Sequence, residues 1–591
     1  MTGTVEPVLA VDGLRIEFGG RSVVEDLSFS VDAGETVAVV GESGSGKSVT
    51  ALSILRLLPS TARMSGSIRL AGRDLLPLSE PQMREVRGGQ VSMIFQEPMT
   101  SLNPVLPVGF QVKEALRYHS RGSDKDCEAE ALRLFDRVRI PDAKRRFNQH
   151  PHTFSGGMRQ RVMIAMALAC RPKLLIADEP TTALDVTVQA QILDLLRDLQ
   201  RETGTAVLFI THDMGVVAQI SDRVLVMRHG RLVESGTAES VFGAPRHPYT
   251  KMLLAAVPRL GDMAGSTGPR RFGEAAAGTK APKLERKPIL EVRDLVTRFP
   301  VKGGFFNRTV GNVHAVERVS FTVREGETLA LVGESGCGKS TTGRSILRLV
   351  EPAAGSVRFD GEDILKLDKR ALQAARRKIQ MIFQDPFGSL DPRQTVGSAI
   401  AEPMLLHGIA NKREVRDKVA YLLQRVGLEP VHATRFPHEF SGGQRQRLCI
   451  ARALALQPKL VIADEAVSAL DVSIKAQVID LLLDLQDEFN LAYLFISHDM
   501  AVVERVSHRV AVMYLGEIVE IGPRADVIGN PRHDYTRRLL AAVPVPDPRR
   551  RTLDRAPLGE ELRSPIRPLN HTPDARNFIE VTPGHFVQAS V

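Results

Sequence analysis

One ordered set of short motifs occurs twice along the chain, and this internal repeat constrains the fold more than any other feature. Gly41-Glu-Ser-Gly-Ser-Gly-Lys47-Ser48 returns as Gly333-Glu-Ser-Gly-Cys-Gly-Lys339-Ser340. Phe154-Ser-Gly-Gly-Met158 returns as Phe440-Ser-Gly-Gly-Gln444, again followed by matching segments. At 591 residues the chain is too long for one hydrophobic core. The repeat therefore predicts a duplicated domain.

Each glycine loop lies between a short apolar run and a stretch with helical periodicity. The runs are Thr36–Val40 and Thr328–Val332, and the helical stretches are 49–58 and 341–349. This pattern predicts strand, loop and helix. Further apolar runs at 174–177, 207–210, 460–463 and 493–496 alternate with helical segments. The expected fold class is α/β, with a largely parallel sheet in each repeat.

Composition changes mark the expected domain boundaries. The stretch after Pro258 is rich in glycine and alanine, and the stretch after Pro544 is polar and rich in proline and arginine. We expect partial order at best in the second stretch, with Asn577–Val587 as the candidate for packing. The predicted parts are a first domain at 1–257, a flexible linker at 258–288, a second domain at 289–545 and a tail at 546–591.

Bulk properties exclude several classes of protein. The N-terminus lacks a basic flank before an apolar stretch, and no apolar run reaches the roughly 18 residues of a membrane span. The four cysteines form no cluster, which favours a reduced compartment. A net charge of +9 comes partly from local runs such as Arg549–Arg551, so it is weak support for nucleic acid binding.

The glycine loops match the pattern GxxxxGKS, which supports nucleotide binding for a physical reason. Glycines let successive backbone N–H groups curl around phosphate oxygens, and the following helix adds its positive end. Lys47 and Lys339 are expected to reach the terminal phosphates, and Ser48 and Ser340 to hold Mg²⁺. The predicted loop contacts are Gly41, Ser43, Gly44, Gly46 and Val49 in the first repeat, and Gly333, Ser335, Gly336, Gly338 and Thr341 in the second.

Two acidic residues end an apolar run in each repeat: Asp178-Glu179 and Asp464-Glu465. A carboxylate held at the end of a buried strand suits Mg²⁺, so each Asp is a predicted metal ligand. Each adjacent Glu is a candidate to polarise the attacking water. A helix cap is the ordinary alternative for such a pair, but both pairs follow a phosphate loop at a similar distance.

Ser155-Gly-Gly-Met158 and Ser441-Gly-Gly-Gln444 resemble the LSGGQ signature of ABC ATPases. The resemblance implies two tandem ABC-type P-loop domains, each with a RecA-like mixed sheet, an antiparallel β subdomain and a helical signature subdomain. It also implies that each signature loop contacts ATP held by the opposite domain, so intramolecular pairing replaces a homodimer.

The same resemblance assigns further residues by motif. Gln96 and Gln384 match the Q-loop glutamine that contacts Mg²⁺, and His212 and His498 match the switch histidine. Phe18 and Phe299 occupy positions where the family stacks a ring on adenine. One implied site joins Lys47, Ser48, Gln96, Asp178, Glu179 and His212 to Ser441, Gly442, Gly443 and Gln444, and the other joins Lys339, Ser340, Gln384, Asp464, Glu465 and His498 to Ser155, Gly156 and Gly157.

Two regions look like oligopeptide and dipeptide importer ATPases: the segments after each Q-loop glutamine, and His247-Pro-Tyr-Thr250 with His533-Asp-Tyr-Thr536. That resemblance implies a peptide importer motor on the cytoplasmic face of a membrane. Its partners would be two permease subunits and, through them, a solute-binding protein, with no nucleic acid. Met158 and Ala466 depart from the family pattern, and we expect both sites to hydrolyse ATP; the sequence leaves their relative activity open.

The alternative from another class is a soluble tandem ABC ATPase that acts on ribosomes or DNA. Such relatives carry a long charged helical segment between domains or zinc-binding CxxC pairs, and this sequence has neither. The sequence leaves the cargo open, with peptides as the leading class and glutathione, nickel chelates or other small solutes as alternatives.

Overall fold

A computed structural model describes residues 6–96, 101–120, 122–182, 184–266, 268–274, 286–303, 308–551, 566–569, 571, 573 and 576–589. Parts of three sequence predictions lie outside these residues: the segment after the first Q-loop glutamine (97–100), the linker at 275–285 and the tail at 552–565. The chain forms two compact units. Unit 1 is Met1–Val257 with Pro544–Leu558, and unit 2 is Pro258–Val543 with Gly559–Val591.

A six-stranded sheet is the centre of unit 1, with strand order β10-β9-β3-β8-β7-β6. The pairs from β9 to β6 are parallel and only β10 runs antiparallel. Every residue of β3, β7 and β8 is buried, as expected for parallel strands covered on both faces. The strands are β3 (Thr36–Val40), β6 (Val91–Ile94), β7 (Leu174–Asp178), β8 (Ala206–Ile210), β9 (Arg223–Arg228) and β10 (Arg231–Thr237).

A second sheet in unit 1 is antiparallel, with strand order β2-β1-β4-β5. Its inward side chains, such as Leu14, Ile16 and Ile68, share one apolar core with the buried strands of the first sheet. These strands are β1 (Leu9–Phe18), β2 (Arg21–Val31), β4 (Ala62–Leu70) and β5 (Arg73–Asp74).

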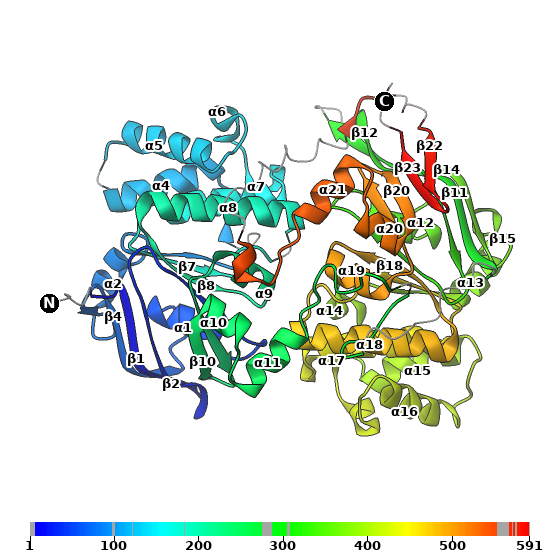
Figure 1. Ribbon diagram of the computed structural model, residues 1–591, viewed down its shortest axis with the longest axis horizontal. Helices are drawn as coiled ribbons and strands as arrows, with labels where there is room; N and C mark the ends of the chain where they lie inside the picture. The colour runs from blue at the N-terminus through cyan, green and yellow to red at the C-terminus, as the bar shows by residue number, and fades with distance from the viewer. Residues whose placement is uncertain are drawn as a thin grey trace. The chain divides into compact units, whose positions relative to one another are not determined.

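The helices of unit 1 fall into two groups, visible in Figure 1. The helices α4, α5 and α6 lie together beside α7 and α8, and the others lie near the sheets. They are α1 (Lys47–Ile54), α2 (Glu80–Val86), α4 (Val108–Ser120), α5 (Asp124–Arg137), α6 (Ala143–Arg146), η1 (Pro151–Thr153), α7 (Gly156–Leu168), α8 (Val186–Thr203), α9 (Met214–Ile220), α10 (Ala238–Gly243), α11 (Pro248–Ala255) and η5 (Pro548–Arg550).

Unit 2 repeats the parallel sheet and extends it at one edge, in the order β16-β17-β18-β13-β19-β20-β23-β22. The two added strands form a hairpin near the C-terminus, and β23 pairs antiparallel with β20. This hairpin coincides with Asn577–Val587, the part of the tail expected to pack. The strands are β13 (Thr328–Val332), β16 (Ile379–Ile382), β17 (Leu460–Asp464), β18 (Ala492–Ser497), β19 (Arg509–Tyr514), β20 (Glu517–Pro523), β22 (Phe578–Thr582) and β23 (His585–Gln588).

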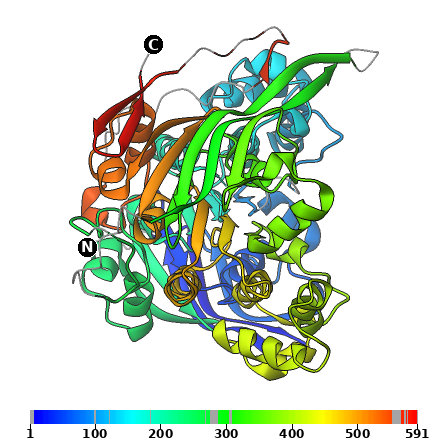
Figure 2. The same cartoon turned by 90° about the vertical axis from the view of Figure 1, so that its right-hand side faces the viewer.

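The antiparallel sheet of unit 2 has the order β15-β14-β11-β12-β21. Its strands β11 and β12 form the long green ribbon of Figure 2. The strands are β11 (Pro288–Gly303), β12 (Arg308–Arg324), β14 (Ala354–Phe359), β15 (Glu362–Asp363) and β21 (Ile566–Arg567).

The helices of unit 2 follow the same order as those of unit 1. They are α12 (Lys339–Ile346), η2 (Ile364–Lys366), α13 (Lys369–Lys378), α14 (Pro386–Ser389), α15 (Val396–Leu406), α16 (Val415–Arg425), η3 (Pro430–Thr434), η4 (Pro437–Glu439), α17 (Gly442–Leu454), α18 (Val472–Phe489), α19 (Met500–Val506), α20 (Arg524–Gly529) and α21 (Asp534–Ala541).

The described part of the predicted linker is held against unit 2. The backbone N–H groups of Gly261 and Phe272 donate to the carboxylates of Glu504 and Asp480, at 2.7 and 2.9 Å. The guanidinium of Arg505 lies 4.1 Å from the centre of the Phe272 ring. We call residues 258–274 the strap. Glycine-rich composition predicted flexibility here, but these contacts come from α18 and α19, which are distant in sequence.

No helix in the described ranges combines the length and the apolar character needed to cross a membrane.

Candidate nucleotide site

The glycine loop of each unit connects a central strand to the first helix, and glycine is required at its last position. Gly46 and Gly338 have φ values of 97° and 108°, in the left-handed region that favours glycine. A Cβ on Gly338 would lie 1.9 Å from the carbonyl oxygen of Ala315. The close backbone approach therefore explains the glycine at this position.

Each loop folds around the ammonium group of its lysine. Lys47 Nζ donates to the carbonyl oxygens of Gly41 and Glu42 at 2.8 and 2.9 Å. Lys339 Nζ makes the same two bonds, to Gly333 at 2.7 Å and Glu334 at 2.9 Å. Both lysine side chains are buried. The chain therefore places one positive charge inside each loop, where a phosphate group would need it.

The hydroxyl after each lysine contacts the aspartate at the end of a parallel strand. Ser48 Oγ donates to Asp178 Oδ1 at 3.1 Å, and Ser340 Oγ donates to Asp464 Oδ1 at 2.7 Å. Burial raises the pKa of both aspartates and outweighs the opposing effect of the serine bonds. The predicted Ser–Asp pair thus forms in each unit.

The same atoms suit Mg²⁺. Asp464 Oδ2 is buried and has no hydrogen-bond partner among the described residues, and a buried charged oxygen without a partner is costly unless a cation satisfies it. The donors are hard oxygens, which Mg²⁺ prefers. The described residues contain no group of three or more His, Cys, Asp or Glu side chains that could hold a metal. Each Ser–Asp pair instead fits an ion that is held by one carboxylate, one hydroxyl and the phosphate oxygens of a nucleotide.

The candidate catalytic glutamate of unit 1 lies between a glutamine and a histidine. Gln96 Nε2 donates to Glu179 Oε2 at 2.9 Å, and His212 Nδ1 lies 3.1 Å from Glu179 Oε1. Thr182 Oγ1 also donates to Glu179 Oε2, at 2.9 Å. Three residues therefore hold this carboxylate, and Gln96 and His212 are distant from it in the sequence.

Unit 2 repeats the arrangement with one difference. Gln384 Nε2 donates to Glu465 Oε2 at 2.8 Å, and His498 Nδ1 lies 3.3 Å from Glu465 Oε1. The hydroxyl of Ser468, which corresponds to Thr182, donates instead to the backbone carbonyl of Glu465. The second carboxylate thus lacks the hydroxyl bond that the first one accepts.

Both glutamates are held in their charged form. Burial raises the pKa of the Glu179 carboxyl, but the hydrogen bond and charge of His212, with the Thr182 bond, outweigh burial and lower the pKa to about 2. The pKa of Glu465 is also lowered, because His498 and Lys339 outweigh burial. An ionised carboxylate can accept a proton from water, which is the role predicted for a general base.

The backbone of these glutamates is strained. Glu179 and Glu465 have φ values of 47° and 49°, which non-glycine residues seldom adopt. Their N–H groups donate to the carbonyls of Ile210 and Ile496, at 2.8 and 3.0 Å. The neighbouring parallel strand therefore fixes the turn that directs each carboxylate toward the histidine.

The signature loops cap their own helices. Ser155 Oγ accepts the N–H of Met158 at the start of α7, and Ser441 Oγ accepts the N–H of Gln444 at the start of α17. In α17 the Gln444 side chain also accepts the Ser441 N–H at 3.0 Å, a bond that the Met158 side chain cannot make. The role of these loops toward nucleotide stays a prediction.

The aromatic residues predicted to stack on adenine lie in the antiparallel sheets, Phe18 at the end of β1 and Phe299 within β11. Phe18 ends β1 and is half-buried against the core of unit 1, whereas Phe299 in β11 is 37% exposed. Val49 and Thr341 follow the loop serines in α1 and α12 and are half-buried. Contact of these four residues with nucleotide stays a prediction.

Sequence reasoning missed one pair of residues at the site. The hydroxyl of Tyr249 accepts the N–H of Glu42, in the first glycine loop, at 3.1 Å. The hydroxyl of Tyr535 accepts the N–H of Glu334, in the second loop, at 3.0 Å. Both tyrosines belong to the His-x-Tyr-Thr segments already singled out. The recurrence of the tyrosine was the available signal, but its target lies about 200 residues away in the sequence.

Family models match both repeats. The model described as ABC transporter matches residues 24–182 and 316–468. The model described as oligopeptide/dipeptide transporter, C-terminal region, matches residues 233–283 and 519–566. The chain belongs to the ABC transporter ATP-binding family. It carries two ABC domains, each followed by an oligopeptide/dipeptide transporter C-terminal region, and the predictions of family, fold class and ATPase activity are confirmed.

Curated relatives resemble the chain over nearly its whole length. Proteins named glutathione import ATP-binding protein GsiA from Escherichia coli O157:H7 and from Pectobacterium atrosepticum are each 58% identical, over 98% of this chain and 96% of theirs. Among solved structures, cbiO1 from Clostridium perfringens, titled as part of an ABC transporter complex, is 26% identical with a TM-score of 0.36. The match covers 41% of this chain and 91% of that one.

Proposed function

We propose that this ABC ATPase is the motor of an importer for short peptides and that both of its sites hydrolyse ATP. One observation carries the proposal. In each unit an ionised glutamate is held between a glutamine and a histidine, beside a glycine loop that encloses a lysine. These groups suit phosphoryl transfer to water, and both copies carry them.

The proposed division of labour follows the geometry. The glycine loops and lysines bind the phosphates, and the Ser48–Asp178 and Ser340–Asp464 pairs would hold Mg²⁺, which neutralises phosphate charge when bound. Glu179 and Glu465 orient water and accept its proton. His212 and His498 fix the two carboxylates, and Gln96 and Gln384 link them to the Q-loops.

The resemblance to the family supports a composite site, in which Ser155 and Ser441 each act on nucleotide bound by the other unit. Each serine begins a helix of 13 residues, and the positive end of a helix suits a phosphate group. Pairing of the two units within one chain would then replace a homodimer.

The proposed cargo class is short peptides, with glutathione as the leading member. The support is the pair of matches to the oligopeptide/dipeptide C-terminal region and the names of the relatives. Two permease subunits and a solute-binding protein would select the cargo, and the chain would act at the cytoplasmic face of the membrane. A ribosome- or DNA-acting ATPase has no comparable support.

Single and double Gln substitutions test hydrolysis. We expect Glu179→Gln and Glu465→Gln each to remove the turnover of its own site, and the double variant to lose about 100-fold or more. Glu80→Gln, at an exposed ion pair with Arg87, is the control and keeps the parent rate. If either single change leaves turnover untouched, that site is not catalytic.

A pull-down from detergent-solubilised membranes tests the transport role. The tagged chain should retain two hydrophobic permeases. Proteoliposomes that contain this complex, supplied with its binding protein outside, should accumulate glutathione or dipeptides only when ATP is enclosed on the side of the membrane where this chain lies. Recovery of ribosomes or DNA in place of permeases would favour the alternative.

A further inference from the structure

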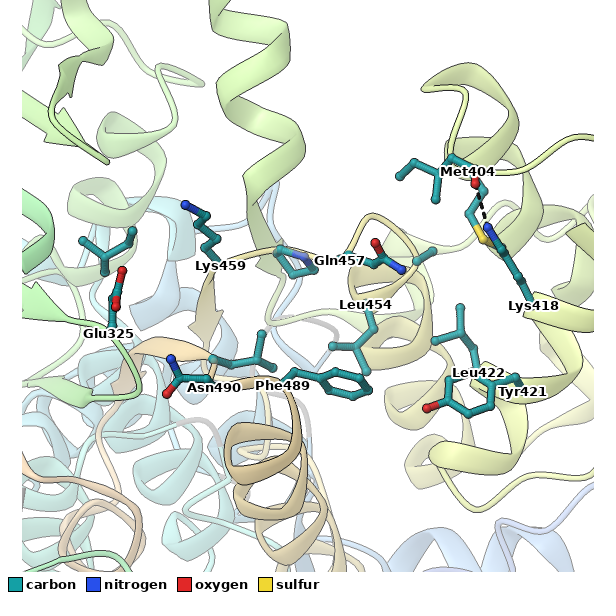
Figure 3. A pocket seen from close by; sticks show the side chains of 15 residues that line it. Glu325, Met404, Lys418, Tyr421, Leu422, Leu454, Gln457, Lys459, Phe489 and Asn490 are labelled. Atoms are coloured by element: carbon teal, nitrogen blue, oxygen red, sulfur yellow. Dashed lines mark hydrogen bonds between the residues drawn. The ribbon is translucent and has the colours of Figure 1, made fainter. Parts of the chain in front are cut away.

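A cavity of about 590 Å³ opens in unit 2, away from the glycine loop. Figure 3 shows its walls: Leu454 and Phe489 lie near the middle, with Lys418, Tyr421 and Leu422 toward one end and Glu325 and Lys459 toward the other. Its volume is within the range of small-molecule sites, and most such sites combine an apolar wall with a few polar groups.

Unit 1 provides an internal comparison, because the counterparts of six of these lining residues surround a space of only about 10 Å³ there. The register follows from matched structural features: Val138 and Val426 cap α5 and α16, and α8 and α18 are both 18 residues long. The matched lining pairs are Glu130/Lys418, Leu134/Leu422, Leu168/Leu454, Ala169/Ala455, Arg171/Gln457 and Thr203/Phe489.

The leucines and the alanine are unchanged between the two copies, whereas the polar positions differ. In unit 1, Glu130 lies 2.9 Å from Arg133 and 3.9 Å from Arg171, so a charged cluster covers this place. In unit 2 the three positions are Lys418, Tyr421 and Gln457. The charged cluster of unit 1 is thus replaced by a lysine, one aromatic ring and an amide, and Phe489 in addition replaces Thr203.

The end of the cavity formed by Lys418 favours an anion. Lys418 Nζ donates to the carbonyl oxygen of Ile409 at 2.7 Å and, in the described ranges, has no carboxylate within ion-pair distance. Lys459, at the other end, forms an ion pair with Asp360 at 2.7 Å. Lys418 therefore supplies an unpaired positive charge at its end of the cavity, whereas the Glu325 carboxylate lines the opposite end. The rings of Tyr421 and Phe489 are 47% and 42% exposed.

We propose that this cavity is a binding site for a small amphipathic carboxylate, with Lys418 pairing the carboxylate and Phe489, Leu422 and Leu454 packing the apolar body. Such a ligand would contact α16, the last residue of α17 and the last residue of α18. The start of α17 is capped by Ser441 of the signature loop. A bound ligand would thus touch the helix that presents the signature of unit 2, whereas the corresponding space lined by described residues of unit 1 is about 10 Å³.

Calorimetric titration of the full-length chain with octanoate, octanol and octylamine tests the proposal. We expect saturable binding of octanoate at one site per chain, with octanol weaker and octylamine absent. Lys418→Glu should weaken octanoate binding roughly tenfold or more, because a hydrogen bond to a charged group is lost and a repulsive charge is added. Phe489→Ala should weaken octanoate and octanol alike. Both side chains are partly exposed, so the variants are expected to fold.

Variants of unit 1 are the matched control. Glu130→Lys and Thr203→Ala should leave octanoate affinity unchanged, because their space is too small for the ligand. ATP affinity, measured on the same samples, should match the parent in all four variants and reports on folding. The proposal is overturned if octanoate does not saturate, if octanol binds as tightly as octanoate, or if Lys418→Glu leaves octanoate affinity unaltered in protein that still binds ATP.

Discussion

At the scale of single residues, the two sites show how a carboxylate is kept charged inside a protein. Glu179 is buried, which by itself favours the neutral acid, yet His212 and Thr182 reverse the outcome. In unit 2 the pKa of Glu465 is also lowered. This happens without a hydroxyl bond to the carboxylate, since Ser468 donates to the backbone carbonyl. The two sites therefore share one design but differ in how firmly the carboxylate is held.

The lowered pKa of Glu179 predicts a pH-dependent stability. The folded-state pKa of about 2 lies below the ordinary 4.5, so the stabilisation is complete above pH 4.5 and is lost as the pH falls through about 2. Relative to Glu179→Gln, the parent should lose about 2 kcal/mol of local stability between pH 6 and pH 3. Hydrogen exchange of β7 peptides, corrected for intrinsic rates, measures this difference. A difference that does not change with pH would contradict the prediction.

Tyr249 and Tyr535 predict a second effect at this scale. Tyr249→Phe and Tyr535→Phe remove the acceptor of a glycine-loop N–H but keep the packed ring, at a cost of about 1 kcal/mol. We expect each variant to bind nucleotide roughly fivefold more weakly at its own site, measured with a fluorescent ATP analogue. Tyr118 is exposed in α4, and the Tyr118→Phe variant should bind the ATP analogue as the parent does. Parent-like affinity in both active-site variants would show that the hydroxyls do not support the loops.

At the scale of elements, capping separates the two signature helices. The Ser441 N–H is satisfied by the Gln444 side chain, and Met158 offers no such acceptor to Ser155. Met158→Gln should therefore stabilise the first turn of α7 by about 0.5–1 kcal/mol, and Gln444→Met should destabilise that of α17 by a similar amount. Hydrogen exchange in the two helix starts measures both changes. Changes of the same sign in the two variants would contradict the capping argument.

The C-terminal hairpin of β22 and β23 is a second element in which the two units differ. It pairs with the edge of β20, and its His585 lies 2.8 Å from Glu520 Oε1, both side chains being buried. Glu234, the counterpart of Glu520 in unit 1, accepts the same two backbone N–H groups without a histidine.

Removal of residues 577–591 should expose the edge of β20, because an unpaired strand edge readily pairs with another chain. We expect the shortened chain to keep its ATPase activity and to self-associate in a concentration-dependent way, measured by analytical ultracentrifugation. A monomer at every concentration tested would show that the hairpin is not needed to protect this edge.

At the scale of the whole molecule, much could be predicted from the sequence because the chain is a duplication. The two glycine loops, the Asp–Glu pairs and the two histidines were all placed by order and spacing, and the α/β core followed from the buried apolar runs. These are local signals: a loop between a strand and a helix needs glycine at fixed positions, whatever surrounds it.

Contacts between distant segments could not be predicted in this way. The strap at 258–274 has the composition of a linker, but carboxylates and a buried arginine on α18 and α19 hold it. Likewise, nothing in the sequence around Tyr249 and Tyr535 indicates which glycine loop each hydroxyl contacts.

The sequence by itself determined which groups carry the phosphate chemistry and that there are two sets of them, since motif order and residue type are properties of the chain. Only the tertiary structure decided how each carboxylate is held, what supports each glycine loop, and that unit 2 opens a cavity of about 590 Å³ where the described residues of unit 1 leave about 10 Å³. The physical reason is that burial, hydrogen bonding and packing volume depend on neighbours distant in sequence. The effect of a single difference, such as Glu130 in unit 1 and Lys418 in unit 2, therefore depends on the side chains around it.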